Sequence, residues 1–542
     1  MTIRQAEQRI VTTIGVALVW SLFLYALDRH ETKHQAERNP SAASAAQRFG
    51  RRVDKILGGA PANKGAWGLL IVDAETGERL YEHNSDKYFL PASNMKLFTT
   101  ALTLATLGAD YRFHTTLEST GTITRAGRLT ASLSLVGRGD PNLSNRKFPF
   151  ELKEEFEGPA EKALADLADQ LVAKGVKVIA GDIIGDDSYF QRERYPSGWE
   201  VDDIVWEYGA AVSALVVNDN TVTLTLRPGR VAGEAVQATI TPSTQDFTVG
   251  NMVVTAPARA KAQLTLTREP GAHLVVVKGA LPKKSPPRKL ILAIEEPALN
   301  AAMIMKELLK ARGVQVEGVA TAQHESVTSD SRGSIQQIFA EHLSVPLRDA
   351  VKVVNKLSQN LHAEVLLRAA MRETAPGKDP GALVKFTTDF YAKAGIAPDD
   401  VIQTDGSGLS RRDLVTPVAV VTLLQYAQTQ PWFGPYYSSL PVAGVDGTLE
   451  DTFKDTVAVG RVHAKTGSFE HVRTLSGFAE TPAGRRLIFS FLSNNQQGKN
   501  RESTDAVEEL CVAMIEEFNA LLPERTRFLI CDTRDSRGES HN

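Results

Sequence analysis

Three short motifs along the chain carry the residue types of an enzyme that works through an acylated serine. They stand in a fixed order: Ser93-Asn-Met-Lys96, Ser358-Gln-Asn360 and Lys465-Thr466-Gly467-Ser468. Ser93 would be the nucleophile, and Lys96, one helical turn later on the same face, would be its base. The second motif would line the opposite wall, and the third would be a strand edge that holds a substrate carboxylate.

A lysine can accept the serine proton only as the free amine. For work at neutral pH its pKa must therefore fall about three units below its usual value of about 10.4. Burial and a nearby second cation produce such a shift, and Lys465 is the candidate for that cation. Ser358 can relay a proton between Lys96 and the leaving group, and Asn360 can donate to the substrate amide.

The third motif also predicts how a peptide would be held. A strand edge carrying Lys465–Ser468 can pair with an extended peptide. The backbone N–H of Ser93, at a helix start, and that of Ser468 would be the two oxyanion donors.

Each motif alone is a weak signal. S-x-x-K is expected about twice by chance in a chain of this length, and K-T-G about one time in ten. Singly, the first two motifs also suit helix caps, and the third suits an exposed strand end. Their joint occurrence in this order, each at the expected element, indicates an active site.

The surrounding pattern predicts the elements that position these motifs. Strands are expected at 67–73 and 79–83, followed by a helix that begins near Ser93 and ends at Gly108. Helices are expected at 346–356 and 361–371, strands at 462–468, 474–479 and 486–492, and a closing helix at 506–521. Between 111 and 330 short β-like stretches alternate with loops, with helices near 160–174 and 298–312.

Composition is ordinary for a globular protein: 42% of the 542 residues are hydrophobic and 23% are charged. Lys and Arg number 61 and Asp and Glu 64, so no basic excess points to nucleic acid. No spacing of His and Cys indicates a metal site, and no cofactor is expected. Cys511 and Cys531 could pair, or Cys511 could be a free buried thiol.

The N-terminus predicts export. Arg4 and Arg9 precede an apolar run from Ile10 to Leu27, which is long for a signal-peptide core and barely long enough to span a bilayer. A small-residue cleavage pattern at 43–45 lies well beyond it. Residues 1–27 are therefore either a cleaved signal peptide or a retained anchor, which would attach the protein to a membrane through residues 10–27. Residues 28–50 are expected to be a linker.

Beyond the three motifs, further tracts make the chain resemble the class C low-molecular-mass penicillin-binding proteins, the D-alanyl-D-alanine carboxypeptidase/endopeptidase family. The matching tracts are Asp405-Gly-Ser-Gly-Leu-Ser-Arg411, Gly139-Asp-Pro-Asn-Leu143, Gly198-Trp199, Ala211-Val-Ser-Ala-Leu215 and Asn218-Asp-Asn220. Motifs one and two are also much farther apart than in a compact β-lactamase, and this family has insert domains there.

The resemblance implies an α+β fold. A three-layer α/β/α penicillin-binding/β-lactamase-like domain with an antiparallel sheet would be interrupted by two nested, mainly β-rich inserts. The catalytic domain would comprise 51–110 and 331–525, and insert domain II would comprise 111–137 and 208–330. Inner insert domain III would run over 138–207, and residues 526–542 would form a C-terminal tail.

The resemblance also implies the chemistry and its setting. Such an enzyme removes the terminal D-Ala of peptidoglycan stem peptides, or cuts D-Ala-diaminopimelate cross-links, and is acylated by β-lactam antibiotics. It would act in the periplasm or on the outer face of the bacterial inner membrane. A β-lactamase or esterase on the same scaffold, and a non-catalytic wall-binding relative, are the alternatives.

Relatives that cut diaminopimelate peptides bind the side-chain ammonium with an acid and its carboxylate with an arginine. By position these roles fall on Asp186 and Arg411, with Asp187 close enough to replace Asp186. All three could instead be turn residues. Phe469 and Glu470 would border the same pocket, although the family often has an amide where Glu470 stands.

Overall fold

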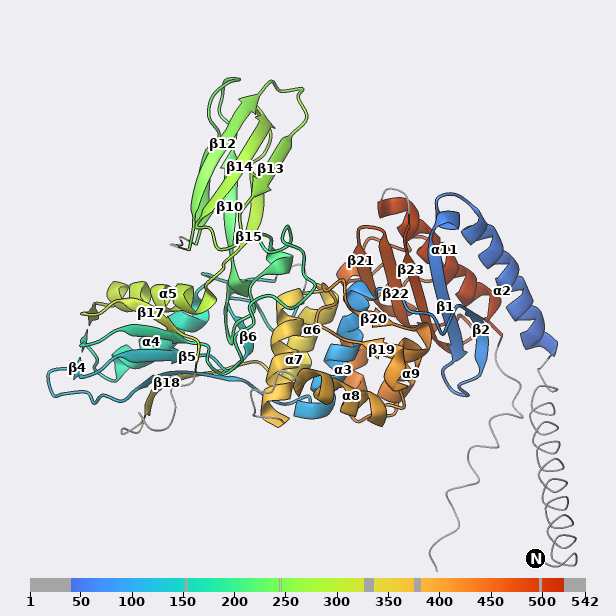
Figure 1. Ribbon diagram of the computed structural model, residues 1–542, viewed down its shortest axis with the longest axis horizontal. Coiled ribbons are helices and arrows are strands. Elements are labelled where there is room, and N and C mark those ends of the chain that lie inside the picture. Colours follow the sequence, from blue (N-terminus) through green and yellow to red (C-terminus); the bar gives the residue numbers. More distant parts are fainter. Residues whose placement is uncertain are drawn as a thin grey trace, which may run out of the picture.

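The computed structural model describes residues 40–520 except 152–154, 243, 245, 326–335, 375–381 and 497–499. Its catalytic part is built on one antiparallel sheet with the strand order β2-β1-β23-β22-β21 (Figure 1). These strands span Arg79–His83, Ala66–Asp73, Arg486–Asn494, Val472–Glu480 and Val462–Phe469. The strands predicted from the sequence are confirmed to within a few residues.

Helices cover both faces of this sheet. Its central strands β1 and β23 are therefore buried on both sides and are apolar at most positions. One face packs against α2 (Pro40–Gly58) and α11 (Asn500–Glu517). The other face packs against the helices that carry the first two motifs and their neighbours. These are α3 (Met95–Leu107), α6 (Leu347–Lys356), α7 (Asn360–Thr374), α8 (Ala382–Lys393), α9 (Pro417–Gln428) and α10 (Phe433–Ser439).

Helix α2 corrects the predicted linker. Residues 40–50 begin this helix, and Phe49 and Val53 on one of its faces are buried against the sheet and α11. The Ala/Ser-rich composition of this segment favours a linker, but apolar residues such as Phe49 and Val53 are spaced four apart, which is typical of one face of a helix. Residues 28–39, the apolar run at 10–27 and the tail at 526–542 lie outside the described residues.

The insert is built on a second five-stranded sheet with the order β17-β8-β5-β3-β18. Its strands span Ala320–Gln323, Ile183–Asp186, Leu133–Val136, His114–Ser119 and Gln337–Leu343. Helices α4 (Lys162–Ala173) and α5 (Pro297–Ala311) pack on its core, close to their predicted positions. Short strands complete it: β4 (Arg128–Leu129), β6 (Asp140–Leu143), β7 (Val178–Ile179), β9 (Leu215–Val217) and β16 (Gln315–Val316).

A third unit, residues 221–293, projects from this insert as a finger (Figure 1). Two three-stranded sheets, β11-β10-β15 and β12-β14-β13, enclose one small core. Their strands span Thr221–Arg227 (β10), Gln237–Thr241 (β11), Thr248–Ala256 (β12), Gln263–Thr267 (β13), Leu274–Pro282 (β14) and Arg288–Ala293 (β15).

The sheets divide the insert differently from the prediction. Residues 138–207 have no sheet of their own, because β8 pairs with β5 and with β17 of the larger insert. The separate inner unit is the finger at 221–293. Strand β18, predicted to belong to the catalytic domain, pairs with β3 of the insert.

Candidate active site

Ser93 lies in a tight 3₁₀ turn, Ala92–Asn94, that leads directly into α3. The preceding Ala92 is wholly buried with a φ of 46°, a left-handed conformation that costs energy for any residue with a side chain. Gly408 makes room for this turn, since a Cβ at that position would lie 1.9 Å from the Ala92 carbonyl oxygen. The nucleophile is therefore held by packing from a second loop as well as by its helix.

Lys96 is wholly buried beneath Ser93. Its Nζ donates to Ser93 Oγ at 2.9 Å, to Asn360 Oδ1 at 2.6 Å and to the Ser407 carbonyl oxygen at 2.7 Å. Burial lowers the pKa of Lys96 to about 7, and the charges of Asp405, Glu364 and Asp413 keep it from falling further. At neutral pH a large fraction of Lys96 is therefore the free amine that can accept the serine proton.

The second and third motifs meet across the cleft. Ser358, with a φ of 60°, lies between α6 and α7, and its Oγ accepts from Lys465 Nζ at 2.9 Å. Lys465 is wholly buried; burial holds its pKa well below the usual range, and neighbouring Lys96 lowers it further. The predicted lysine pair is therefore present, and two positive charges side by side are disfavoured there.

Strand β21 supplies the opposite rim as the edge strand of its sheet. Its Thr466 hydroxyl hydrogen-bonds that of Thr448 at 2.7 Å. Gly467 packs against the nucleophile's turn, since a Cβ there would lie 2.6 Å from the Pro91 carbonyl oxygen and 3.0 Å from Ser93 N. Ser468 follows at the open cleft, so the third motif sits directly beside Ser93.

The motifs open into a cleft of about 620 Å³. It is lined by Ser93, Asp203, Tyr208, Ser358, Asn360, Gly408, Leu409, Arg411, Ser468, Phe469 and Glu470. The five predicted catalytic residues thus converge, with the lysines at its base, and the predicted pocket residues Arg411, Phe469 and Glu470 lie on its wall.

Arg411 has acidic and aromatic neighbours in this cleft. Its guanidinium lies 3.8 Å from the centre of the Phe469 ring and forms an ion pair with Glu200, with N–O distances of 3.2 and 3.3 Å. Asp203 also lines the cleft; burial raises its pKa, and the Tyr208 hydroxyl hydrogen-bonds its carboxylate. The sequence prediction missed Glu200, Asp203 and Tyr208, although Glu200 directly follows the Gly198-Trp199 tract and the other two lie in the same segment.

The predicted acid partners of Arg411 lie elsewhere. Asp186 is in β8, where it accepts from the Ser188 backbone N–H and from Gln323 Nε2, each at 2.9 Å. Asp187 accepts from Ser213 Oγ at 2.7 Å and contacts the ring nitrogen of His324 at 2.8 Å. Neither lines the cleft. In this structure the acids near Arg411 are Glu200 and Asp203.

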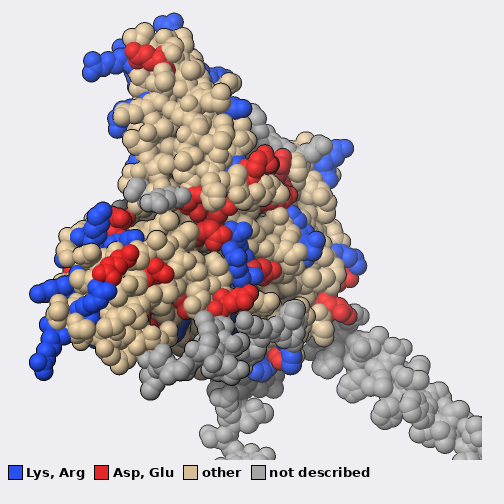
Figure 2. Space-filling view, turned by 60° about the vertical axis from the view of Figure 1, so that its left-hand side comes forward, with Lys and Arg blue, Asp and Glu red and all other residues tan. Residues whose placement is uncertain are grey.

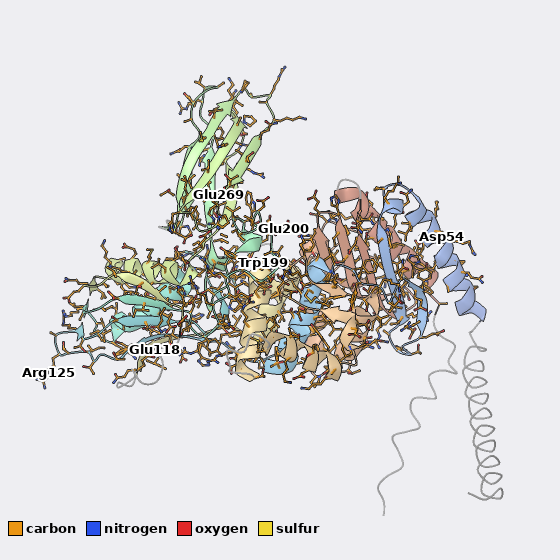
Figure 3. All side chains as sticks on the ribbon, in the orientation of Figure 1. Asp54, Glu118, Arg125, Trp199, Glu200 and Glu269 are labelled. Atoms are coloured by element: carbon orange, nitrogen blue, oxygen red, sulfur yellow. The ribbon has the colours of Figure 1, made fainter. Side chains whose placement is uncertain are left out.

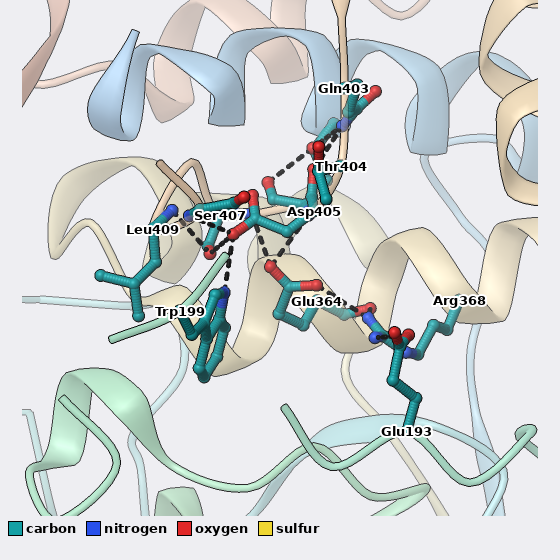
Figure 4. Close-up of polar contacts among 12 residues, drawn as sticks. Glu193, Trp199, Glu364, Arg368, Gln403, Thr404, Asp405, Ser407 and Leu409 are labelled. Atoms are coloured by element: carbon teal, nitrogen blue, oxygen red, sulfur yellow. Dashed lines mark hydrogen bonds and ion pairs between the residues drawn. The ribbon is translucent and has the colours of Figure 1, made fainter. Parts of the chain in front are cut away.

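A buried carboxylate cluster holds the loop beneath Lys96 (Figure 4). Asp405 accepts from the backbone N–H of Gly408 at 2.6 Å and from Trp199 Nε1 at 2.8 Å. Glu364 on α7 accepts from Ser407 N at 2.8 Å. Burial and neighbouring Asp405 raise the pKa of Glu364 to about 7. These bonds fix the Ser407 carbonyl that accepts from Lys96, so the Asp405–Arg411 tract is a support for the base.

The described residues contain no group of three or more His, Cys, Asp or Glu placed to hold a metal ion. His362, beside the second motif, is buried and contacts Asp219 at 2.8 Å, and His463 stacks on Tyr437 with ring centres 4.2 Å apart. Cys511 is buried in α11, whereas its suggested partner Cys531 lies outside the described residues. No described helix is long and apolar enough to cross a bilayer.

Comparisons with known proteins identify the family of the chain. The family model described as D-Ala-D-Ala carboxypeptidase 3 (S13) matches residues 50–513. A D-alanyl-D-alanine carboxypeptidase of Actinomadura sp. (strain R39) is 34% identical over 457 residues, which cover 82% of this chain and 81% of the relative. One of Haemophilus influenzae is 27% identical over 442 residues, covering 80% of this chain and 87% of the relative.

Solved structures show the same fold. The crystal structure of penicillin-binding protein 4 from Haemophilus influenzae superposes with a TM-score of 0.74 at 26% identity, covering 86% of this chain and 99% of that one. A structure of the same protein complexed with a β-lactam gives a TM-score of 0.69 at 24% identity, covering 87% of this chain and all of that one. The predicted α+β penicillin-binding fold with extra domains is confirmed.

Proposed function

Because the chain belongs to the D-Ala-D-Ala carboxypeptidase 3 (S13) family of serine peptidases, we propose that it hydrolyses peptidoglycan stem peptides through an acylated Ser93. The observation that carries this proposal is the Lys96 amine, 2.9 Å from Ser93 Oγ with a pKa near 7. A base of this pKa can activate the hydroxyl at neutral pH.

The geometry supports a simple sequence of steps. Ser93 Oγ attacks the carbonyl of the bond between the two D-Ala residues while Lys96 accepts its proton. The backbone N–H groups of Ser93 and Ser468 stabilise the oxyanion. The proton on Lys96 then goes to the leaving amine, and we propose Ser358, whose Oγ accepts from Lys465 Nζ, as its relay. Water later releases the acyl group from Ser93.

The leaving group can be free D-Ala or the diaminopimelate amine of a cross-link, while the D-Ala carbonyl stays on Ser93 as the acyl group, so we propose both carboxypeptidase and endopeptidase action. The cleft is open at the β21 edge, where an extended peptide can add as a further strand. β-Lactams, as mimics of the scissile bond, should acylate Ser93. The β-lactam-bound structure of the Haemophilus influenzae relative supports this.

Lys465 is expected to recognise the terminal carboxylate. Lys465→Ala should lower kcat/KM for a peptide with a free carboxylate about 10- to 100-fold, the range for losing a hydrogen bond to a charged group. For the same peptide with a C-terminal amide, the fall in kcat/KM caused by Lys465→Ala should be smaller. Exposed Lys454→Ala in the same segment serves as the control. An equal loss on acid and amide would exclude this role.

Arg411 is expected to contact a side-chain carboxylate. Arg411→Ala should lower kcat/KM about tenfold more for a diaminopimelate peptide than for a minimal D-Ala-D-Ala substrate. Glu200→Gln is the matched variant, because it frees the guanidinium and should raise diaminopimelate cleavage. Equal losses on both substrates in Arg411→Ala would make Arg411 a structural residue instead.

We further propose that the enzyme works outside the cytoplasm, in the periplasm or on the outer face of the inner membrane. The basic residues and apolar run before residue 28 support export, with the segment either cleaved or kept as an anchor. Fractionation of cells producing the full chain, with N-terminal sequencing of the product, tests both possibilities.

The decisive experiment is intact-mass spectrometry of the full chain after incubation with benzylpenicillin, followed by peptide mapping. A stable adduct on Ser93 would establish the acyl-serine mechanism. Hydrolysis of the penicillin without a lasting adduct would support the β-lactamase alternative. If a folded protein gives no adduct and does not hydrolyse the penicillin, the result would support the alternative of a non-catalytic wall-binding relative.

A further inference from the structure

The far end of the finger gathers three turns, at 228–236, 257–262 and 283–287. The finger's base is fixed by the bond from Ala293 N to the Val205 carbonyl oxygen, so β10 runs outward from Thr221 to Arg227. At the outer end Leu226 pairs with Arg288, and Lys283 N donates to the Ala256 carbonyl oxygen at 2.9 Å. Gly229 N donates to Thr255 Oγ1 at 2.9 Å. The three turns therefore lie together as one tip.

This tip is strongly basic. It exposes Arg227, Arg230, Arg259, Lys261, Lys284 and Arg288. Over the three turns and the strand ends beside them, Glu234 is the one acidic residue in the sequence. Figure 2 shows the finger largely in tan, with blue side chains around its end and a smaller red patch among them.

The tip cations are available to a partner. Among the described residues none of the six forms an ion pair with an acidic side chain. Glu234 instead accepts from the backbone N–H groups of Arg230 at 2.8 Å and Val231 at 3.0 Å. The chain as a whole carries a formal charge of −3, so the positive charge of the tip is a local feature rather than a reflection of composition.

The finger is attached to the wall of the active-site cleft. The segment that carries Asp203 and Tyr208 runs past the finger's base, where Trp206 forms a β-bridge with Leu292 of β15. Figure 3 shows Trp199 and Glu200 at this junction, between the catalytic part and the finger. A polymer touching the tip is thereby held at a fixed position relative to the cleft.

We propose that the tip is a docking surface for the peptidoglycan network that the cleft cuts. This proposal rests on the proposed function, because the occupant is the polymeric form of that substrate. Each uncut stem peptide presents free carboxylates, so the network is a repeating array of anions. The arginine and lysine side chains of the tip can contact several of these carboxylates at once, each contact being weak by itself. Simultaneous contact at tip and cleft raises the effective concentration of peptide at Ser93.

The test compares two full-length variants with equal changes in charge. The tip variant carries Arg230→Gln, Arg259→Gln, Lys261→Gln and Lys284→Gln. The control variant carries Arg79→Gln, Lys310→Gln, Lys385→Gln and Lys454→Gln, all at exposed positions away from the tip. Circular dichroism and thermal unfolding establish that both fold.

Two activities are measured for each: cleavage of purified insoluble peptidoglycan, and kcat/KM for a soluble D-Ala-D-Ala peptide. We expect the tip variant to lose about tenfold or more on the polymer and nothing on the soluble peptide. The control variant should match wild type on both. Equal polymer cleavage by tip variant and wild type would overturn the proposal, and so would equal losses on polymer and soluble peptide in the tip variant.

Binding distinguishes the occupants. Ser93→Ala is added to the wild-type chain and to the tip variant to prevent digestion. The chain with an unchanged tip should then co-sediment with peptidoglycan. The co-sedimented fraction should fall for the tip variant, and also when the carboxylates of the peptidoglycan are methyl-esterified. Tip-dependent binding to phosphatidylglycerol vesicles without binding to peptidoglycan would overturn the proposal in favour of a lipid surface. Failure of the wild type on the soluble peptide would instead refute the proposed function, which keeps the two failures distinct.

Discussion

Ser93→Ala is expected to abolish covalent labelling by benzylpenicillin and to lower peptide turnover by on the order of 10⁶-fold, as removal of an acyl-enzyme nucleophile does elsewhere. No other hydroxyl among the described residues takes its place at the Lys96 amine, which donates to Ser93, Asn360 and the Ser407 carbonyl. Loss of the Ser93 oxygen therefore removes the group that is acylated and leaves the base without a proton to accept.

The measurement is intact-mass spectrometry with penicillin, combined with steady-state turnover of a D-Ala-D-Ala peptide. Ser438→Ala, at an exposed position on α10, is the matched control and should label like wild type. Alanine fits the helix start with little cost, so the thermal unfolding of Ser93→Ala should stay close to that of wild type. An adduct that persists on another residue of the cleft would refute Ser93 as the nucleophile.

Lys96→Arg is expected to lower the rate of acylation about 10²- to 10⁴-fold, the usual contribution of a general base. Arginine keeps the positive charge, but its guanidinium does not lose a proton in proteins and cannot accept one from Ser93. Lys352→Arg on α6 is the control, because that lysine pairs with Asp349 at 3.1 Å outside the cleft. Acylation at the wild-type rate in Lys96→Arg would contradict the assignment.

The pH dependence of wild type gives an independent check on Lys96. Its pKa of about 7 means that below this pH the amine is mostly protonated and cannot act as the base. The rate of penicillin acylation should therefore fall about tenfold for each pH unit below about 7 and level off above it. A rate that is flat between pH 5 and 8 would exclude Lys96 as the group that accepts the proton.

The convergence of the three motifs could be predicted from the sequence, because the residues within each motif are close together along the chain. Ser93 and Lys96 are one helical turn apart, so any helix starting there brings them together. The Lys465 motif sits in a strand, β21, that pairs along its whole length with the next strand in the sequence, β22, so the sheet has few ways to arrange it. The catalytic strands and α3 were therefore placed to within a few residues.

The side-chain pocket could not be predicted in the same way. Arg411 meets Glu200 only because the Asp405 loop packs against the loop at Trp199, and no spacing along the chain reports that contact. Asp186 looked suitable by position, but strand pairing turned it toward Gln323 in the insert. The division of the insert failed for a related reason, since β8 pairs with strands far away in sequence.

The order of the strands in the catalytic sheet also constrains how this molecule is made. Residues 66–73 of β1 pair along their whole length with 487–494 of β23, so the sheet closes only after nearly the entire chain has emerged. The finger and the insert sheet draw their strands from within the middle of the chain and can form earlier. Pairing between strands so far apart in sequence also slows folding. Because β23 is needed to close the sheet, the Ser93 cleft can form only once this strand has been synthesised. The enzyme therefore becomes active only towards the end of synthesis.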